Sequence, residues 1–403
     1  MALASGVAKQ VRIKKETTYG TPPGAAGAQQ MRRVTSDLSL NKDSYQSAEM
    51  RSDYQKADMR HGVRRVQGSV NGELSPLSYS ALLASALRKD LAAITATSGL
   101  TITISGSGPT YILQRSTGSY LTDGFKVGQV RRLTAGGFAA GNLNKNLLVV
   151  DVTANQLTVR TLNGSALVAE GPIATATLSF PGKQTFVPQT AHTNDSYAIE
   201  HFFADVSQSE LFTGLNVNTV AINLPPTGMA TINLGFVGKD TVNNNAAYYT
   251  SPADAPTTGI VAAVNGLLLV GGSASAICTG LSINIDNGYS GEPVVGSNTI
   301  PQQVPGRVSV SGQVTAYFED AVMRDQFINE VEFGVVVVLT TSNADNADFI
   351  SFVMPRNKSK SASKDDGEKN IIQTIAFDSL LAVNGGAGAK DEKTTILIQD
   401  SAA

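Results

Sequence analysis

The phrase "LSLNKDSYQSAE" at residues 38–49 returns as "LSINIDNGYSGE" at residues 281–292. Six positions are identical without a gap, at a constant offset of 243: Leu38/Leu281, Ser39/Ser282, Asn41/Asn284, Asp43/Asp286, Ser47/Ser290 and Glu49/Glu292. A second pair of phrases, "GVRRVQGSV" (62–70) and "GRVSVSGQV" (306–314), follows at an offset of 244 with four identities: Gly62/Gly306, Val66/Val310, Gly68/Gly312 and Val70/Val314. Two phrases in the same order, at nearly the same offset, favour gene duplication over chance.

Each copy is predicted to hold a strand, a connection, a second strand, a short helix and further strands. In the first copy Ser75 is the expected N-cap of the helix, and Pro76 its first residue. Helical spacing predicts one apolar face, made by Tyr79, Leu82, Leu83 and Ala86. In the second copy Asp320 is the expected cap. Met323 and Phe327 then take the places of two first-copy residues, Tyr79 and Leu83.

A hairpin is predicted later in the first copy, where apolar residues alternate on both sides of the turn "PPTG": Val220, Ile222, Leu224, Ile232, Leu234 and Phe236. In the second copy the polar segment 356–370 is predicted to be a loop in the place of this turn. Segment 241–258 has the composition of a linker.

Residues 94–189 interrupt the first copy between its helix and its later strands. Short alternating strands separated by Gly and Asn turns predict a small β-barrel or sandwich with its own core. The candidate core residues are Phe125, Val127, Leu148, Val150 and Leu157.

The predicted fold is mainly β, with two β-sandwich or barrel modules, a short helix flanking each, and a small inserted β-barrel. The expected division of the chain is a flexible or partner-ordered N-terminal arm (1–30), a first module (31–93 and 190–256), the insert (94–189) and a second module (257–403).

Composition and motifs argue against several classes of function. A formal charge of −2 does not provide the dense basic surface that strong nucleic-acid binding requires. Cys278 is the only cysteine, no signal peptide is evident, and the most apolar run, 259–272, is too short to span a bilayer. The three histidines show no metal-ligand spacing, and no phosphate loop or nucleophile elbow occurs. We therefore expect no cofactor, no metal and no enzyme activity, and folding in a reducing cytoplasm.

Four phrases resemble the major tail tube proteins of long, non-contractile bacteriophage tails: "KETTYGTPP" (15–23), "EMRSDYQKADMRHGVRRVQGSVNGELSP" (49–76), "GSYLTDGFKVGQV" (118–130) and "DVSQSELFTGLNVN…LGFVGKD" (205–240). The resemblance implies tail-tube-type modules that assemble as stacked rings around a channel. It also implies a virion location, with a tape measure protein inside the tube, terminator and tip proteins at its ends, and double-stranded DNA passing through without specific binding.

The duplication then has an explanation in the assembly. Family members with one module form rings of six, so three chains with two modules each would give a pseudo-sixfold ring. Two other classes stay open: a duplicated β-domain adhesin or host-surface-binding module, which would remain a discrete monomer or small oligomer, and a secretion-system tube protein, which shares the fold.

The connection at 49–61 is the candidate inter-ring contact. Its charges alternate in sign: Glu49, Arg51, Asp53, Lys56, Asp58 and Arg60. The corresponding segment of the second copy, 292–306, is nearly uncharged, so charge is not needed merely to connect the strands. The resemblance implies that this loop reaches the neighbouring ring, where it would become ordered.

Overall fold

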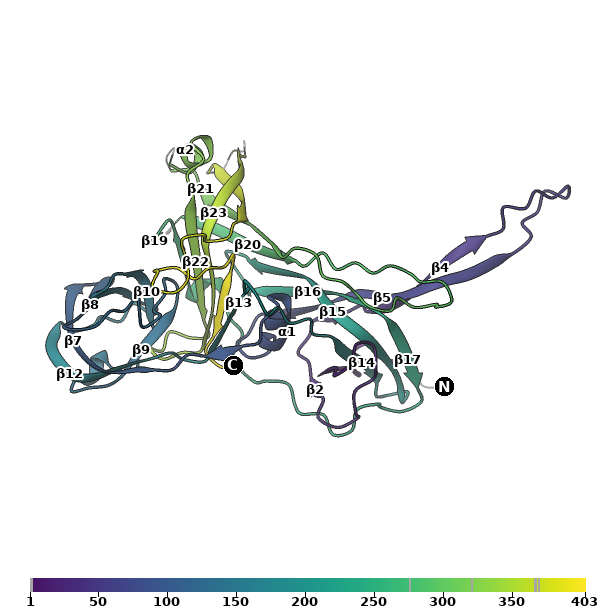
Figure 1. Ribbon diagram of the computed structural model, residues 1–403, viewed down its shortest axis with the longest axis horizontal. Coiled ribbons are helices and arrows are strands. Elements are labelled where there is room, and N and C mark those ends of the chain that lie inside the picture. The colour runs from purple at the N-terminus through teal and green to yellow at the C-terminus, as the bar shows by residue number, and fades with distance from the viewer. Residues whose placement is uncertain (1–2, 275–276, 320–321, 366–367, 369) are drawn as a thin grey trace.

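The structure, a computed structural model, describes residues 1–403 except 1–2, 275–276, 320–321, 366–367 and 369. It is mainly β, with large sheets, a closed six-stranded barrel and little helix, which confirms the predicted fold class (Figure 1). The elements of the first copy are β1 (Lys9–Lys15), β2 (Gln29–Gln30), β3 (Thr35–Ser36), β4 (Ser39–Gln46), β5 (Met59–Glu73), α1 (Ser80–Ala86), β14 (Tyr197–Phe203), β15 (Gln208–Leu224), β16 (Thr231–Gly238) and β17 (Asp240–Asn244).

The second copy repeats this order of elements. Its elements are η2 (Ala263–Asn265), β18 (Gly266–Val270), β19 (Ser273–Ala274), β20 (Cys278–Asp286), β21 (Ser309–Tyr317), α2 (Val322–Ile328), β22 (Phe333–Thr340), β23 (Phe349–Lys364), β24 (Ile372–Ser379) and β25 (Leu397–Asp400).

The strand pairings repeat as well. In the first copy β4 pairs with β5, β5 with β16, and β16 with the second half of β15, while the first half of β15 pairs with β14 and β17. In the second copy β20, β21, β24 and β23 pair in the same sequence, and the first half of β23 pairs with β22 and β25. β1 lies beside β14 as β18 lies beside β22.

Even the irregularities of the ladders recur. A β-bulge separates Val217 from Thr219 in β15, and another separates Ser359 from Ser361 in β23. The two bulges lie 142 residues apart and at equivalent positions of the two strands. A second register shift occurs where β14 meets β15, and again where β22 meets β23. Because a bulge changes the direction and twist of a strand, shared bulges mean that the two copies follow the same backbone path.

The repeated glycines mark equivalent positions. Gly68 lies opposite Phe236, and Gly312 lies opposite Phe377. A Cβ atom on Gly312 would lie only 2.4 Å from the Phe377 ring, so a side chain is excluded there. One difference appears in register: Ser39 pairs with Gln67, whereas its counterpart in β20 pairs two residues further along β21. An even slip keeps the apolar residues on the inner face.

The helices correct two details of the sequence prediction. α1 begins at Ser80, and Ser75 does not cap it, because its hydroxyl donates to Ser78 Oγ at 2.7 Å. The predicted apolar face is buried nonetheless, through Tyr79, Leu82, Leu83 and Ala86. In the second copy Asp320 and the Met323 side chain lie outside the described residues. Phe327 is 38% exposed, so α2 does not bury it as α1 buries Leu83.

Three segments expected to be irregular contain strands. The N-terminal range 1–30 includes β1, which pairs with β14 over its whole length. Range 241–258 begins within β17. Range 356–370 continues β23 to Lys364. Polar, charged composition suggested irregular structure in all three. Exposed strand positions tolerate such residues, and the buried Arg12 of β1 is paired with Glu200.

The insert folds into a closed barrel with strand order β10-β11-β8-β7-β12-β9. Its strands are β7 (Thr97–Ser107), β8 (Thr110–Arg115), β9 (Val130–Ala135), β10 (Leu147–Val152), β11 (Gln156–Thr161) and β12 (Glu170–Ser179), with the short helix η1 (Ala140–Asn142). Phe125 and Leu157 lie in its core, and Val127 packs against that core as predicted. Leu148 and Val150 do not, because they point outward into a different cluster.

That cluster joins the barrel to the second copy. Val130 and Leu148 share this cluster with six buried residues of the second copy: Leu269, Val336, Val338, Phe349, Val353 and Leu397. The Val130 N–H also donates to Gln399 Oε1 at 2.8 Å. The strands that enter and leave the insert, β6 (Ala92–Ala93) and β13 (Lys183–Phe186), pair with each other, and β13 pairs with β25. The insert interrupts the first copy in sequence but rests on the second.

We predict that Leu148→Ala lowers the free energy of unfolding by about 2–5 kcal/mol, because it leaves a cavity in a buried interface. The urea midpoint of the full chain measures this. Val168→Ala, on an exposed part of the same barrel (56% exposed), is the control and should change stability by less than about 0.5 kcal/mol. Equal small effects would mean that the barrel is not held to the second copy by this cluster.

Candidate assembly surfaces

A backbone ladder joins the two copies into one sheet. The second half of β15 pairs with β16 on one side and with β20 on the other, from Thr219↔Asp286 to Leu224↔Leu281. The resulting strand order is β4-β5-β16-β15-β20-β21-β24-β23. Ile222 and Ile283 lie opposite each other in a single hydrophobic core that spans both copies. We call this joint the β15–β20 seam.

The two ends of this sheet carry edges that pair on one side among the described residues. At one end β4 pairs with β5, and its side chains are mostly exposed. At the other end the second half of β23, Asn357–Lys364, pairs with β24. The equivalent half of β15 has β20 on its other side and is largely buried. Exposed strand edges are templates for association with another chain.

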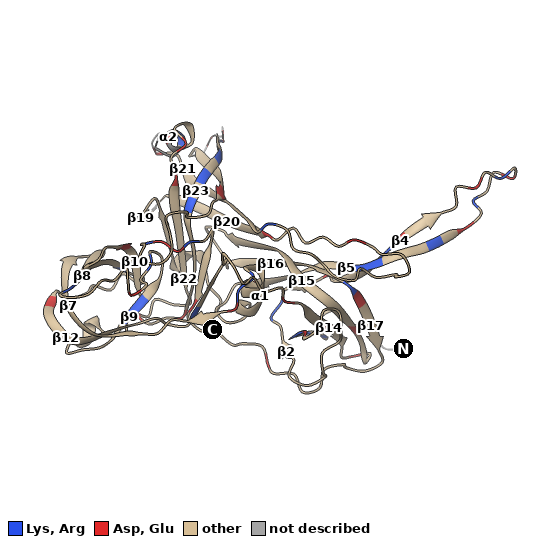
Figure 2. Ribbon diagram, in the orientation of Figure 1, with Lys and Arg blue, Asp and Glu red and all other residues tan. Residues whose placement is uncertain are grey.

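One face of the sheet is polar, with small neutral side chains on its central strands and charged residues toward its two ends, such as Arg65 and Lys358. A row in register across five strands consists of Asn71, Asn233, Ala221, Asn284 and Ser311. The next row consists of Glu73, Thr231, Asn223, Ser282, Gln313 and Ala376. Figure 2 shows few charged residues along the central strands β16, β15 and β20, and basic residues at the two ends of the sheet, on β5 and β23. The centre of the face offers many neutral hydrogen-bonding groups and little positive charge, so it would hold phosphates weakly.

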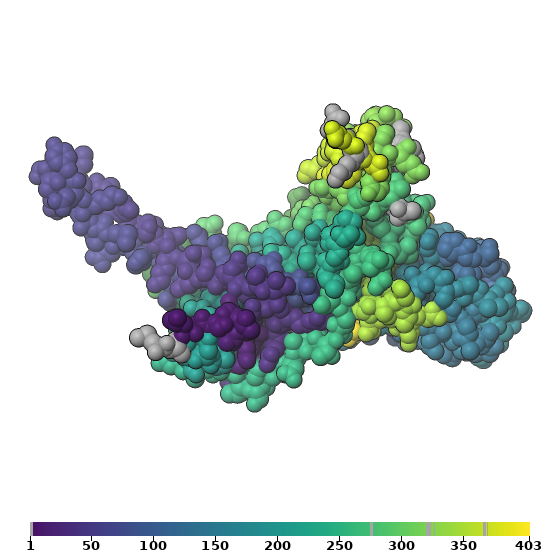
Figure 3. Space-filling model, turned by 180° about the vertical axis from the view of Figure 1, so that it is seen from behind, coloured from purple at the N-terminus to yellow at the C-terminus, as the bar shows by residue number. Residues whose placement is uncertain are grey.

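The predicted contact residues all lie on a long hairpin that projects from the sheet. β4 and β5 continue past the body of the molecule as a two-stranded arm, with residues 47–58 at its tip (Figures 1 and 3). Arg51 Nη2 lies 2.7 Å from Asp53 Oδ2, and Arg60 Nε lies 2.9 Å from Asp58 Oδ2. Lys56 contacts Gln46, and Glu49 is exposed. The structure therefore brings the six residues to one arm and pairs four of them within it.

The tip of the arm also carries apolar side chains, which the sequence analysis did not single out. Met50 is 99% exposed and Tyr54 is 100% exposed. Their position between charged residues hid them, because no apolar period marks an isolated hairpin tip.

A basic cleft lies between β1 and β3. Lys9 Nζ donates to the Ser36 carbonyl at 2.8 Å, and Arg33 Nη2 donates to the Gly6 carbonyl at 3.2 Å. Burial and the neighbouring Arg33 charge lower the pKa of Lys9. Next to the cleft, His201 Nε2 lies 2.7 Å from Ser36 Oγ. Burial, with the Lys9 and Arg33 charges, lowers the pKa of His201 to about 3. Sequence reasoning missed this site, because its residues are far apart in the chain.

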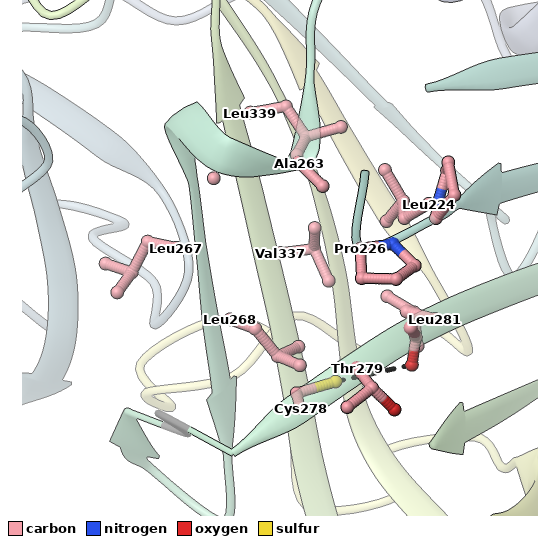
Figure 4. Close-up of a pocket in the computed structure, with 13 residues that line it drawn as sticks. Leu224, Pro226, Ala263, Leu267, Leu268, Cys278, Thr279, Leu281, Val337 and Leu339 are labelled. Carbon is pink, nitrogen blue, oxygen red and sulfur yellow. Dashed lines mark hydrogen bonds between the residues drawn. The ribbon is translucent and has the colours of Figure 1, made fainter. Parts of the chain in front are cut away.

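The equivalent cleft of the second copy is apolar and holds the turn of the β15–β16 hairpin (Figure 4). Leu224 and Pro226 face Leu268, Cys278 and Val337 across a cavity of about 140 Å³. The Cys278 thiol donates to the Gly280 carbonyl at 3.3 Å, and burial raises its pKa, so it is a protonated, structural residue rather than a nucleophile.

Within the described part of the chain, no group of three or more His, Cys, Asp or Glu residues is placed to hold a metal ion. No described helix is long and apolar enough to cross a membrane. The surfaces that the fold does provide are edges, a projecting arm and a polar sheet face, which are features of a protein that associates with other chains.

The family of phage tail tube proteins matches residues 6–379, which is nearly the whole chain. The chain belongs to this family and is a structural component of a phage tail. Among curated proteins no match was found.

We predict that acidification destabilises the fold through His201. Its folded pKa of about 3 lies below the ordinary value of 6.5, so the unfolded chain binds a proton that the folded chain does not. Stability is therefore full above about pH 6.5 and falls by up to about 1.4 kcal/mol for each pH unit below it. Urea unfolding at pH 7, 6 and 5 measures the slope.

The His201→Gln variant should show a shallower slope over this range. His192→Gln, at an exposed histidine, is the control and should keep the wild-type slope. An unchanged slope in His201→Gln would show that other groups cause the acid sensitivity.

Proposed function

We propose that this chain polymerises into stacked rings that form the tube of a phage tail, the conduit for genome delivery. The observation that carries the proposal is the β15–β20 seam, an assembly joint already made inside one chain. Membership of the tail tube family supports it. The subunits would assemble in the host cytoplasm and act in the virion.

Three chains would close such a ring. β4 is the first-copy equivalent of β20, and the second half of β23 is the second-copy equivalent of the second half of β15. Pairing β23 of one chain with β4 of the next would therefore repeat the β15–β20 seam. Three chains supply six copies, giving true threefold and pseudo-sixfold symmetry. Closure would also remove both exposed edges.

The polar sheet face would line the channel of this ring. Its neutral side chains suit a wall past which double-stranded DNA moves without specific binding. A tape measure protein would occupy the channel during assembly, and terminator and tip proteins would close the two ends of the tube. The inserted barrel packs on the second copy away from this face, so three barrels would decorate the exterior.

The arm would make the contact between rings. It extends beyond the sheet, and its tip combines six charged residues with the exposed side chains of Met50 and Tyr54. The ion pairs within the arm add little stability, because both partners are exposed. The β4–β5 ladder would hold the arm in shape, while its outward surface contacts the next ring.

Cysteine pairs across the proposed joint test both the partner edge and the ring number. In a Cys278→Ser background, Ser363→Cys is combined with Asn41→Cys or with Ser39→Cys. Ser363 is the equivalent of Ala221, whose partner across the β15–β20 seam is Asn284. By the sequence offset of 243 the equivalent of Asn284 in β4 is Asn41, whereas by the strand register it is Ser39, so both partners are tested. Oxidised assemblies should give a ladder of disulfide-linked chains that ends at three, in mass about three times the 42.1 kDa chain.

An Ala221→Cys/Asn284→Cys variant is the control, because these residues face each other within one chain and should cross-link without changing mass. A ladder ending at six would contradict the three-chain ring. Assemblies that show no cross-link with either partner would contradict the β4–β23 joint.

The arm is tested by reversing two of its charges. Arg51→Glu/Arg60→Glu should leave a folded subunit that forms rings but stacks into tubes much more slowly, because the reversed charges repel the neighbouring acidic groups of the arm. Negative-stain microscopy and light scattering in low salt measure ring and tube formation. Lys183→Glu, at an exposed lysine on β13, is the control. Tubes formed at the wild-type rate would rule out a stacking role for these charges.

A further inference from the structure

The seam inside the chain has a second part besides its backbone ladder. The turn of the β15–β16 hairpin reaches into the cleft between β18 and β20. Its backbone is held there, since the Ala230 N–H donates to the Val261 carbonyl at 3.0 Å and Met229 bridges Ala262. The side chains at this contact are apolar, including Leu224, Pro226 and Leu268 (Figure 4). Within one chain, then, a hairpin tip of the first copy fills a cleft of the second.

The first copy has the same cleft in the equivalent place. It lies between β1 and β3, and a turn at residues 6–8 precedes β1 as η2 precedes β18. Its lining includes Val7, which is 96% exposed, so the cleft opens to the surface. Its chemistry differs from that of the second-copy cleft, because Lys9 and Arg33 line it, whereas no charged residue lines the second-copy cleft. Burial and the Arg33 charge lower the pKa of Lys9, while Glu210 and Asp37 act on it in the opposite direction. Lys9 and Arg33 are the charged residues that line the cleft itself, so the cleft favours an anionic partner.

The hairpin tip equivalent to the β15–β16 turn is the β23–β24 tip, whose described residues carry two carboxylates and one ammonium group, that of Lys364, and are therefore net negative. Asp365 and Glu368 are both exposed there. Ile371 stands at the position of the buried Ala230 and is 43% exposed. Residues 366–367 and 369 lie outside the described residues. This tip combines an exposed apolar residue with exposed carboxylates, whereas its first-copy counterpart is apolar.

We propose that the β23–β24 tip of one chain docks in the Lys9–Arg33 cleft of the next, so that the seam between chains is electrostatic while the seam within each chain is apolar. The proposal rests on the proposed ring. Burying Ile371 would repeat the contact of Ala230, and Glu368 would face the two cations. Charge would also determine which cleft the tip binds. An acidic tip makes no favourable electrostatic contact in the uncharged second-copy cleft, so it would bind the first-copy cleft of another chain. Rings would then dissociate at three salt-sensitive joints and leave intact chains.

Charge exchange tests the proposal. Glu368→Arg and Arg33→Glu are each made in the full chain, and the two are then combined. Each single variant should need at least about tenfold more protein for half-maximal ring formation at low salt. The combined variant should recover most of the loss. Mass photometry across a concentration series measures ring formation, and raising the salt should shift the wild type in the same direction as the single variants.

Asp254→Arg, at an exposed carboxylate far from this tip in sequence, is the control and should assemble like the wild type. Arg33 also binds backbone carbonyls, so thermal unfolding of each monomer checks its fold. If Arg33→Glu does not fold, the Glu368→Arg variant and the salt series alone test the docking contact. If salt does not change ring formation by the wild type and Glu368→Arg does not change it either, the docking contact is overturned, whereas the proposed ring is not. Failure of the wild type to form rings under any condition would instead overturn the proposed function.

Discussion

The fold depends on the backbone ladder between β15 and β20. β15 belongs to two sheets, because its first half pairs with β14 and β17 and its second half with β16 and β20. The bulge between Val217 and Thr219 marks the change. This single strand therefore connects the core of the first copy, its polar sheet face and the first strands of the second copy in one continuous sheet. The edges at β4 and β23 are the two ends of that same sheet.

The copies have kept the ladder and diverged in what covers their outer sheets. In the first copy Arg12 and Glu200 form a buried ion pair, 3.2 Å apart, next to the buried ring of Tyr249. In the second copy the position of Glu200 is taken by Val336, which packs against the inserted barrel. A buried ion pair requires further hydrogen bonds, which the first copy supplies through the Tyr249 N–H and carbonyl. An apolar surface such as that around Val336 is stabilised by any apolar surface that packs on it, so the inserted barrel can pack on the second copy.

The contrast between apolar and charged clefts follows the same logic. Contacts inside one chain form once and at high effective concentration, so they can be apolar and permanent. A contact between chains has to select the correct partner from several similar surfaces. Opposite charges on the β23–β24 tip and at Lys9 and Arg33 would add that selectivity, while the repeated backbone geometry defines where the two meet.

The sequence alone predicted the mainly β class, the repeated phrases, a small β-barrel or sandwich in the insert and a part of its core. The fold class and these core residues follow from local periodicity, as with Val220 and Ile222 in β15 and Phe125 and Leu157 in the barrel. The repeat follows from identical residues at a nearly constant offset. It also located the charged arm, whose residues are contiguous. Its errors occurred where local composition was ambiguous: polar strands such as Asn357–Lys364 resembled loops, and Ser75 resembled a helix cap.

Only the tertiary structure decided which surfaces meet. Leu148 and Val150 alternate along β10 as core residues would, yet they face the second copy, because both sides of a barrel strand that docks on another sheet are buried. Lys9 and His201 converge because β1 and β14 pair across nearly two hundred residues of chain, and Arg33 joins them because β2 pairs with β1. The β15–β20 ladder joins backbones through N–H and C=O groups that every residue carries. Its existence and register therefore depend on how the copies pack, and no side-chain pattern reveals them.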